Sequence, residues 1–154
     1  MPSLLQLTWS THGSKKGRYA LRVMIDLAEH ENGSYIPLKD IAARQEISKK
    51  YLEIIMKDMV NGELVTGASG KGGGYMLCRK PEEYSVGEIL ELMEGPLCSV
   101  ACLSGKDADC PRRAICQTLP MWTEYDDMVH DYFYGKKLSD LIRQENTSQQ
   151  TANA

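Results

Sequence analysis

Residues 37–62 carry the feature that most restricts the fold, which is two short amphipathic segments joined by a tight turn. Apolar residues recur at helical spacing in LKDIAARQ, directly after Pro37, which is well placed near a helix start. Ser48 is a good N-cap for KKYLEIIMKDMVNG, whose apolar residues form one stripe. A short helix, a turn and a longer capped helix with basic residues in its first turn is the helix-turn-helix arrangement, in which the second helix reads the major groove of DNA.

The segments on either side complete a winged helix-turn-helix. Upstream, apolar residues at three- and four-residue steps predict a helix over residues 14–30. Downstream, short strands at residues 63–66 and 75–78 flank the run GASGKGGG and predict a hairpin wing. This run lacks the Gly-Lys-Ser/Thr ending of a phosphate loop and leads into a strand, so we reject nucleotide binding.

The C-terminal half is predicted to be helical as well. Ser85 can cap a helix that carries Val86, Ile89, Leu90 and Met93. A long acidic helix then carries an apolar stripe from Leu119 to Phe133 that includes Trp122, Tyr125, Val129 and Tyr132. We interpret this stripe as a dimer seam rather than core, because helix-turn-helix proteins commonly read two half-sites as dimers. The fold class expected is therefore mainly α with a small β-hairpin wing and a long C-terminal dimerisation helix.

The charges differ between the two halves. Residues 14–80 carry 12 Lys/Arg against 8 Asp/Glu, a net of +4, whereas residues 81–154 carry 6 against 13, a net of −7. A basic half suits a polyanionic partner, and an acidic half suits sensing or assembly. No apolar run approaches the roughly 20 residues that cross a bilayer, and the N-terminus lacks a secretory signal pattern. We therefore expect a cytoplasmic protein without membrane contact, whose five cysteines are thiols or ligands rather than disulfides.

Four regions are expected along the chain. They are a flexible N-terminal extension at 1–13, a DNA-binding domain at 14–80, a cysteine loop with dimerisation helices at 81–144, and a disordered tail at 145–154.

Three cysteines lie in the polar run CLSGKDADCPRRAIC, between the two C-terminal helices. Seven residues separate Cys102 from Cys110, and five separate Cys110 from Cys116. Thiolates at such spacing bind a soft metal ion or an iron–sulfur cluster, since a flexible loop can fold around either. A DNA-reading module joined to such a loop predicts a transcription factor that senses metal or redox state.

Several motifs together resemble the Rrf2 family of bacterial regulators. They are GRYALRVMIDLAEH, ISKKYLEIIMKDMVNGELV, GKGGGYML, SVGEILELMEGPL and the three-cysteine loop. The resemblance covers roughly residues 14–144 and is strongest to the branch with a cysteine triad, which includes IscR-, NsrR- and RirA-like regulators. It implies a winged helix-turn-helix homodimer, expected to act as a repressor, that crosses through its long helices and binds a palindromic operator in double-stranded DNA.

The resemblance also implies that the cysteine triad holds an iron–sulfur cluster, because Cys102, Cys110 and Cys116 match the ligand positions. Two features depart from the pattern: seven residues lie between Cys102 and Cys110, where IscR-like members more often have five, and the fourth-ligand position does not carry the expected residue. Leu119 stands where IscR-like members carry a ligand histidine, and Arg18 stands where NsrR-like members carry an aspartate for the partner subunit. The fourth ligand is therefore open, and Cys98, four residues before Cys102, is the candidate thiolate. Cys98 could equally be a small buried residue at the end of the preceding helix.

Candidate DNA contacts lie at three places. The first turn of the recognition helix presents Ser48, Lys49, Lys50 and Tyr51 to phosphates and bases. The first helix opens with Lys15, Lys16, Arg18 and Tyr19, which could hold the backbone. The wing tip carries Lys71, together with Ser69 at a position where many family members have an arginine suited to a narrow minor groove.

The sequence is also compatible with other sensing mechanisms. Cysteines 98, 102, 110 and 116 could instead form a zinc site, or Arg112 and Arg113 could favour direct oxidation of the thiols. Control by a protein partner is a further alternative, which the resemblance to the cysteine regulator CymR suggests. We expect no enzyme, because the sequence offers no nucleophile–histidine–carboxylate set and no cofactor fingerprint.

Overall fold

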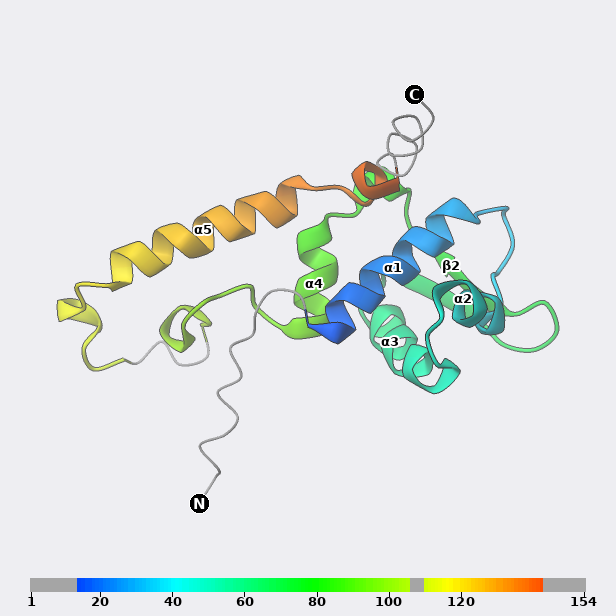
Figure 1. The fold of residues 1–154 in the computed structure, drawn as a ribbon, viewed down its shortest axis with the longest axis horizontal. Coiled ribbons are helices and arrows are strands. Elements are labelled where there is room, and N and C mark those ends of the chain that lie inside the picture. Colours follow the sequence, from blue (N-terminus) through cyan, green and yellow to red (C-terminus); the bar gives the residue numbers. More distant parts are fainter. Residues whose placement is uncertain (1–13, 106–109, 143–154) are drawn as a thin grey trace, which may run out of the picture.

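The computed structural model describes residues 14–105 and 110–142 (Figure 1). The predicted extension at 1–13 and tail at 145–154 lie outside these residues. The described elements, in chain order, are α1 (Lys15–Glu29), α2 (Leu38–Gln45), α3 (Lys49–Asn61), β1 (Val65–Ala68), β2 (Gly74–Leu77), α4 (Val86–Glu94) and α5 (Leu119–Gly135), with short 3-10 turns at Pro81–Glu83, Ala101–Leu103 and Arg113–Ile115. The predicted class, mainly α with a hairpin wing, is confirmed.

Helices α2 and α3 form the predicted helix-turn-helix. Glu46 takes a left-handed conformation with φ of 53°, which ends α2 and turns the chain toward α3. The Ser48 hydroxyl accepts a hydrogen bond from the Tyr51 N–H at 3.2 Å, so Ser48 caps α3 as its sequence position indicated.

One hydrophobic core joins α1 to the helix-turn-helix and to α4. Its largest fully buried side chains are Val23, Met24, Leu27, Ile41, Leu52, Ile55, Met56, Met59, Val65, Tyr84, Ile89 and Leu138. The Tyr84 hydroxyl donates to the Leu64 carbonyl at 2.7 Å and accepts from the Arg79 N–H at 2.8 Å. Tyr84 therefore fixes the base of the wing to the segment that leads into α4.

A buried carboxylate connects α1 to α2. The side chain of Asp26 is fully buried and accepts hydrogen bonds from Arg44 at 2.7 and 3.0 Å and from the Gln45 amide at 2.9 Å. Burial alone would raise the pKa of Asp26, but the hydrogen bonds from Arg44 and Gln45 outweigh it and hold the pKa below its ordinary value of 3.8. This ion pair is thus one of the contacts that hold α2 against α1.

The wing is present, but both of its strands lie differently from the prediction. β1 starts two residues later than expected, because Glu63 has a φ of 57° and Leu64 N–H bonds back to the Met59 carbonyl at 2.9 Å. These residues still belong to the turn that ends α3. β2 begins at Gly74, whose φ is 151° and where a Cβ would lie 2.1 Å from the Ile36 carbonyl oxygen. That close approach lets Tyr75 pair with Ile36 through two backbone hydrogen bonds of 2.9 Å.

In the C-terminal half, the chain after α5 returns to the start of α4. Ser85 caps α4 as predicted, accepting from the Glu88 N–H at 3.1 Å. At this return, Val86 N–H donates to the Lys136 carbonyl at 2.9 Å and Leu138 N–H donates to the Tyr84 carbonyl at 3.1 Å. Between these contacts α5 reaches away from the core (Figure 1). Among the described helices, none has the length and apolarity needed to cross a membrane.

Candidate DNA-binding surface and cysteine segment

The first turn of α3 presents two free lysines. Lys49 and Lys50 are exposed, directly after the Ser48 cap, and neither forms an ion pair within the described residues. A capped helix start with two unpaired cations matches the way recognition helices meet phosphates and base edges. The predicted contacts of α3 are thus brought together on one surface.

The start of α1 lies beside the start of α3. The rings of Tyr19 and Tyr51 meet edge to face, with centroids 5.7 Å apart. The ammonium of Lys15 lies 5.6 Å from the Tyr19 centroid and 5.4 Å from the Tyr51 centroid. Because cation–π contacts hold a lysine over a ring while leaving its charge accessible, Lys15 adds a positive group to the surface of α3.

Arg22 extends this surface, and the sequence reasoning missed it. Its guanidinium lies 5.1 Å from the Tyr19 centroid and donates to both the carbonyl and the side chain of Gln45, at the end of α2. Arg22 thus joins α1 to the end of α2 next to the turn. The only signal in the sequence was its position one helical turn after Arg18, which does not reveal the partner on α2.

The two other cations of α1 differ in their surroundings. Lys16 forms an ion pair with Asp58 of α3. Arg18 is exposed and its side chain has no hydrogen bond or ion pair to the described residues. A DNA contact of Lys16 would have to compete with Asp58, whereas Arg18 is available without rearrangement. Both contacts stay predictions.

The wing tip carries the last of the predicted DNA contacts. Ser69 and Lys71 are both exposed, next to Gly70 and Gly72, whose φ angles are 88° and 76°. These left-handed glycines let the hairpin turn tightly, so the tip stays narrow. The tip projects from the same side of the molecule as α2 and α3 (Figure 1).

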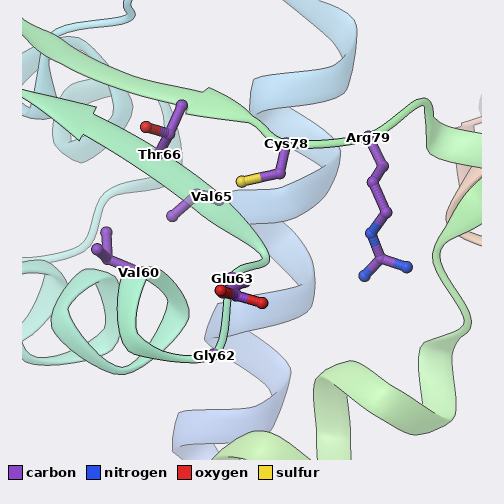
Figure 2. A pocket seen from close by; sticks show the side chains of 7 residues that line it. All are labelled: Val60, Gly62, Glu63, Val65, Thr66, Cys78 and Arg79. Carbon is purple, nitrogen blue, oxygen red and sulfur yellow. The ribbon is translucent and has the colours of Figure 1, made fainter.

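An open cavity of about 570 Å³ lies at the base of the wing (Figure 2). Its lining residues are Val60, Gly62, Glu63, Val65, Thr66, Cys78 and Arg79. Cys78 is exposed here. Arg79 is bound to Glu88 at 2.6 Å and lies 4.3 Å from the Tyr84 centroid. Arg79, the cation of this lining, is thus already paired with Glu88.

The cysteine segment, residues 95–118, connects α4 to α5. Cys98, Cys102, Cys110 and Cys116 are half-buried thiols without disulfides. Ser99 N–H donates to Asp126 of α5 at 2.9 Å, and within the segment the Arg113 guanidinium donates to the Cys102 carbonyl at 2.9 Å. Within the residues that the structure describes, no group of three or more Cys, His, Asp or Glu side chains is arranged to hold a metal ion. The structure therefore places the triad in one segment without gathering its sulfur atoms around a point.

The thiols at the two ends of this segment differ in acidity. A hydrogen bond with the Thr118 hydroxyl, 3.5 Å from the sulfur, lowers the pKa of the Cys116 thiol, and the Thr118 backbone N–H adds to the effect. Burial raises the pKa of Cys98, and the nearby carboxylates of Asp126 and Glu91 raise it further. Since the thiolate is the nucleophile, Cys116 is the more reactive of the two.

This difference predicts an order of alkylation. In metal-free protein at roughly pH 7.5, limiting iodoacetamide should label Cys116 before Cys98, as measured by mass spectrometry of peptides over time. Thr118→Val removes the hydroxyl and should slow the labelling of Cys116 while leaving that of Cys98 unchanged. Equal rates at the two cysteines in the unmodified chain would contradict the assignment.

Helix α5 has two different apolar sides. Val129 and Phe133 pack on a small cluster formed by Val86, Leu90 and Leu97. Met121, Tyr125, Met128 and Tyr132 remain exposed, and Met128 and Tyr132 are each 60% accessible. No described residue of α5 is buried. The predicted stripe is thus divided between a contact with α4 and an uncovered face.

Comparison with known proteins decides the family. The model of the Rrf2 family, described as an iron-dependent transcriptional regulator, matches residues 13–144. The chain belongs to the Rrf2 family. It is 31% identical over 150 residues to the transcriptional regulator IscR of Pectobacterium atrosepticum, which covers 91% of this chain and 90% of that protein.

Solved Rrf2-type structures share the fold. The IscR of T. potens superposes with a TM-score of 0.70 at 28% identity and covers 89% of this chain and 90% of its own. CymR, the global cysteine regulator of B. subtilis, superposes with a TM-score of 0.68 at 31% identity, over 86% and 96%. As a member of this family, the chain is a winged-helix transcriptional regulator that binds DNA, and the relatives are regulators rather than enzymes.

Proposed function

We propose that this Rrf2-family regulator is a homodimer that binds a palindromic operator and senses iron, redox or nitric-oxide status through an iron–sulfur cluster. The observation that carries the DNA-binding half is the exposed, Ser48-capped start of α3, with Lys49 and Lys50 unpaired beside the Tyr19–Tyr51 contact. In this proposal, residues 14–80 bind DNA, whereas residues 81–144 sense the signal and form the dimer.

Each part of the DNA surface has its own role. Lys49 and Lys50 contact phosphates and base edges in the major groove, and the N–H groups of the first turn of α3 lie beside them. Lys15, Arg18 and Arg22 hold the phosphate backbone from α1. Ser69 and Lys71 at the wing tip approach the minor groove, where serine gives weaker reading of a narrow groove than arginine would.

The uncovered face of α5 supports the dimer. Met121, Tyr125, Met128 and Tyr132 form an apolar row that monomeric soluble proteins rarely leave in water. A second α5 crossing this row would bury it and would place two α3 helices on one side. Two such helices can read half-sites about 34 Å apart, which is one turn of DNA.

The donor set fits an iron–sulfur cluster by its chemistry. Cys102, Cys110 and Cys116 are free thiols, soft ligands of the kind that hold such clusters, and Cys98 supplies a fourth within the same segment. A bound cluster would supply reversible redox chemistry and would be lost or modified under the signal. The protein's own part is to gather the three thiols, which requires the cysteine segment to rearrange from the conformation seen here.

Replacing the triad tests this assignment. Protein purified without oxygen should be brown, should absorb at about 400 nm, and should contain iron and sulfide in stoichiometric amounts relative to the protein. Cys102→Ala, Cys110→Ala and Cys116→Ala together should remove colour and iron and leave the helical circular dichroism unchanged. Cys78→Ala, at the base of the wing, is the matched control and should keep both. A triple variant that retained full iron would contradict the site.

A second sensing chemistry is supported by one observation. The described thiols are not gathered, and the lowered pKa of Cys116 makes it reactive toward oxidants in its present conformation. Direct thiol oxidation would then replace the cluster in a regulator that binds DNA in the same way. Colour separates these cases, because thiols do not absorb visible light.

A further inference from the structure

The start of α1 needs a negative charge that its own sequence does not provide. The first turn contains Lys15 and Lys16 and no acidic residue. A helix N-terminus carries a partial positive charge, so two lysines there are unfavourable and a nearby anion is favourable. The cap residue Ser14 satisfies one N–H, that of Gly17, at 3.2 Å.

Glu94 provides this charge from the other half of the chain. Its Oε1 accepts a hydrogen bond from the Ser14 N–H at 2.8 Å and a second from the Ser14 hydroxyl at 2.6 Å. A Cβ on Gly17 would lie 2.1 Å from the same oxygen, so only glycine leaves room for the carboxylate. The other oxygen, Oε2, is buried and has no hydrogen-bond partner in the described structure. Within the described structure, the hydrogen bonds that the Glu94 side chain makes are therefore both to Ser14, at the start of α1.

Glu94 also stands where the cysteine segment begins. It is the last residue of α4, and Gly95 follows with a φ of 86°, which turns the chain away from the helix. Leu97 is buried against α4 and α5, and its N–H donates to Glu91 at 3.3 Å. A rearrangement of the cysteines thus reaches the carboxylate that holds α1 through Leu97, which lies between Glu94 and Cys98.

The other side of the same turn is held by α3. Lys16 pairs with Asp58, near the end of the recognition helix. The first turn of α1 is consequently fixed between two carboxylates, one from α3 and one from α4. A shift of Glu94 would change how Lys15, Arg18 and Tyr19 lie relative to Lys49 and Lys50.

We infer that Glu94 is a positioning residue for DNA binding, which holds the basic start of α1 in register with α3 and passes changes in the cysteine segment to it. This inference rests on the proposed function, since it requires an operator and a sensing state. Glu94 itself does not touch DNA.

Glu94→Ala is a test because the loss of its charge and the loss of its hold on α1 should change DNA affinity in opposite directions. Loss of a negative charge near a DNA-binding surface should by itself strengthen binding. If Glu94 positions α1, binding should instead weaken about tenfold, the effect expected from losing a charge-assisted hydrogen bond. The probe is the duplex that the unmodified full-length protein enriches from a random pool of roughly 30 base pairs, long enough for two half-sites. Glu82→Gln, an exposed residue with the same charge change, should bind as the unmodified protein does.

A conservative variant and a second readout separate positioning from loss of fold. Glu94→Gln keeps an oxygen that accepts from Ser14 but loses the charge, so its affinity should lie between those of Glu94→Ala and the unmodified protein, within about threefold of the latter. Each protein is also measured after reconstitution with ferrous iron and sulfide, and again after treatment with a chelator. The ratio of the operator affinity after reconstitution to the operator affinity after chelation should differ from one in the unmodified protein and in Glu82→Gln. It should approach one in Glu94→Ala.

The outcomes are distinct. Weaker binding and a lost ratio in Glu94→Ala, with recovery in Glu94→Gln, support the inference. Unchanged or stronger binding by Glu94→Ala, or an unchanged ratio, overturns the inference and leaves the proposed function intact. An unmodified protein that enriches no duplex in either state overturns the proposed function, and this inference with it.

Discussion

Asp26→Ala should lower the free energy of unfolding by about 2–4 kcal/mol, because it removes a fully buried carboxylate and its hydrogen bonds, although its partner Arg44 stays one-third exposed. Asp26 is fully buried and accepts three hydrogen bonds, two from Arg44 and one from Gln45. Its loss leaves the Arg44 guanidinium and the Gln45 amide without this acceptor and weakens the contact between α1 and α2, which Arg22 and the apolar core still hold. Urea unfolding followed by circular dichroism measures the change. A domain of this size is typically stable by about 5–15 kcal/mol, so the variant would lose a large part of its stability.

Two comparisons show whether the charge is the cause. Glu31→Ala, in the exposed turn after α1, should change stability by less than about 0.5 kcal/mol. Because the pKa of Asp26 is lowered in the folded protein, its carboxylate stabilises the fold above the ordinary value of 3.8, and this contribution disappears as the pH falls through the lowered value. Asp26→Asn cannot ionise and should lack this part of the acid dependence. A loss below about 1 kcal/mol in Asp26→Ala would contradict the assigned role.

Lys49→Ala combined with Lys50→Ala should weaken operator binding about 100-fold at physiological salt, the second large effect that we expect. Both side chains are exposed and unpaired at the start of α3, so their loss removes DNA contacts without disturbing the core. In a plot of log affinity against log salt, the slope should become less steep by about 0.9 for each phosphate contact that is lost. Fluorescence anisotropy with a labelled duplex over a range of salt concentrations gives both quantities.

The matched control removes two lysines, and therefore the same charge, at a site outside α3. Lys136 and Lys137 lie at the end of α5, away from α3 in Figure 1. Their joint replacement by alanine should alter affinity by less than about threefold, through the long-range field alone. If both double variants weakened binding equally, the net charge of the protein would explain the loss, and α3 would not be the recognition helix.

The helices could be predicted closely because their signals are local. Apolar residues at every third or fourth position and one capping serine define each of α3 and α4. Both helices begin directly after the expected cap. The wing was harder to place. Glu63 looked like the first residue of a strand, yet its left-handed backbone still belongs to the end of α3. A non-glycine residue in that conformation leaves no mark in the sequence.

The candidate site shows the same limit more strongly. The exposure of Lys49 and Lys50 could be predicted from their place after the cap, and their contact with DNA stays a prediction. Lys16 looked equivalent to Arg18, and only the fold reveals that Asp58, 42 residues away, neutralises it. Glu94 and Ser14 are 80 residues apart, and no pattern in either segment indicates that they meet. Pairings of this kind depend on how helices cross, which sequence periodicity does not describe.

The backbone hydrogen bonds that join Val86 to Lys136 and Tyr84 to Leu138 make everything between them a closed loop on the DNA-binding part. The entropy cost of closing a flexible loop grows only with the logarithm of its length, by about 0.6 kcal/mol for each doubling. Residues added between Cys102 and Cys110 therefore cost almost nothing, because both ends of the loop stay fixed. The spacing between these two cysteines, seven residues here and more often five in IscR-like regulators, can therefore vary while the DNA-binding part keeps its stability.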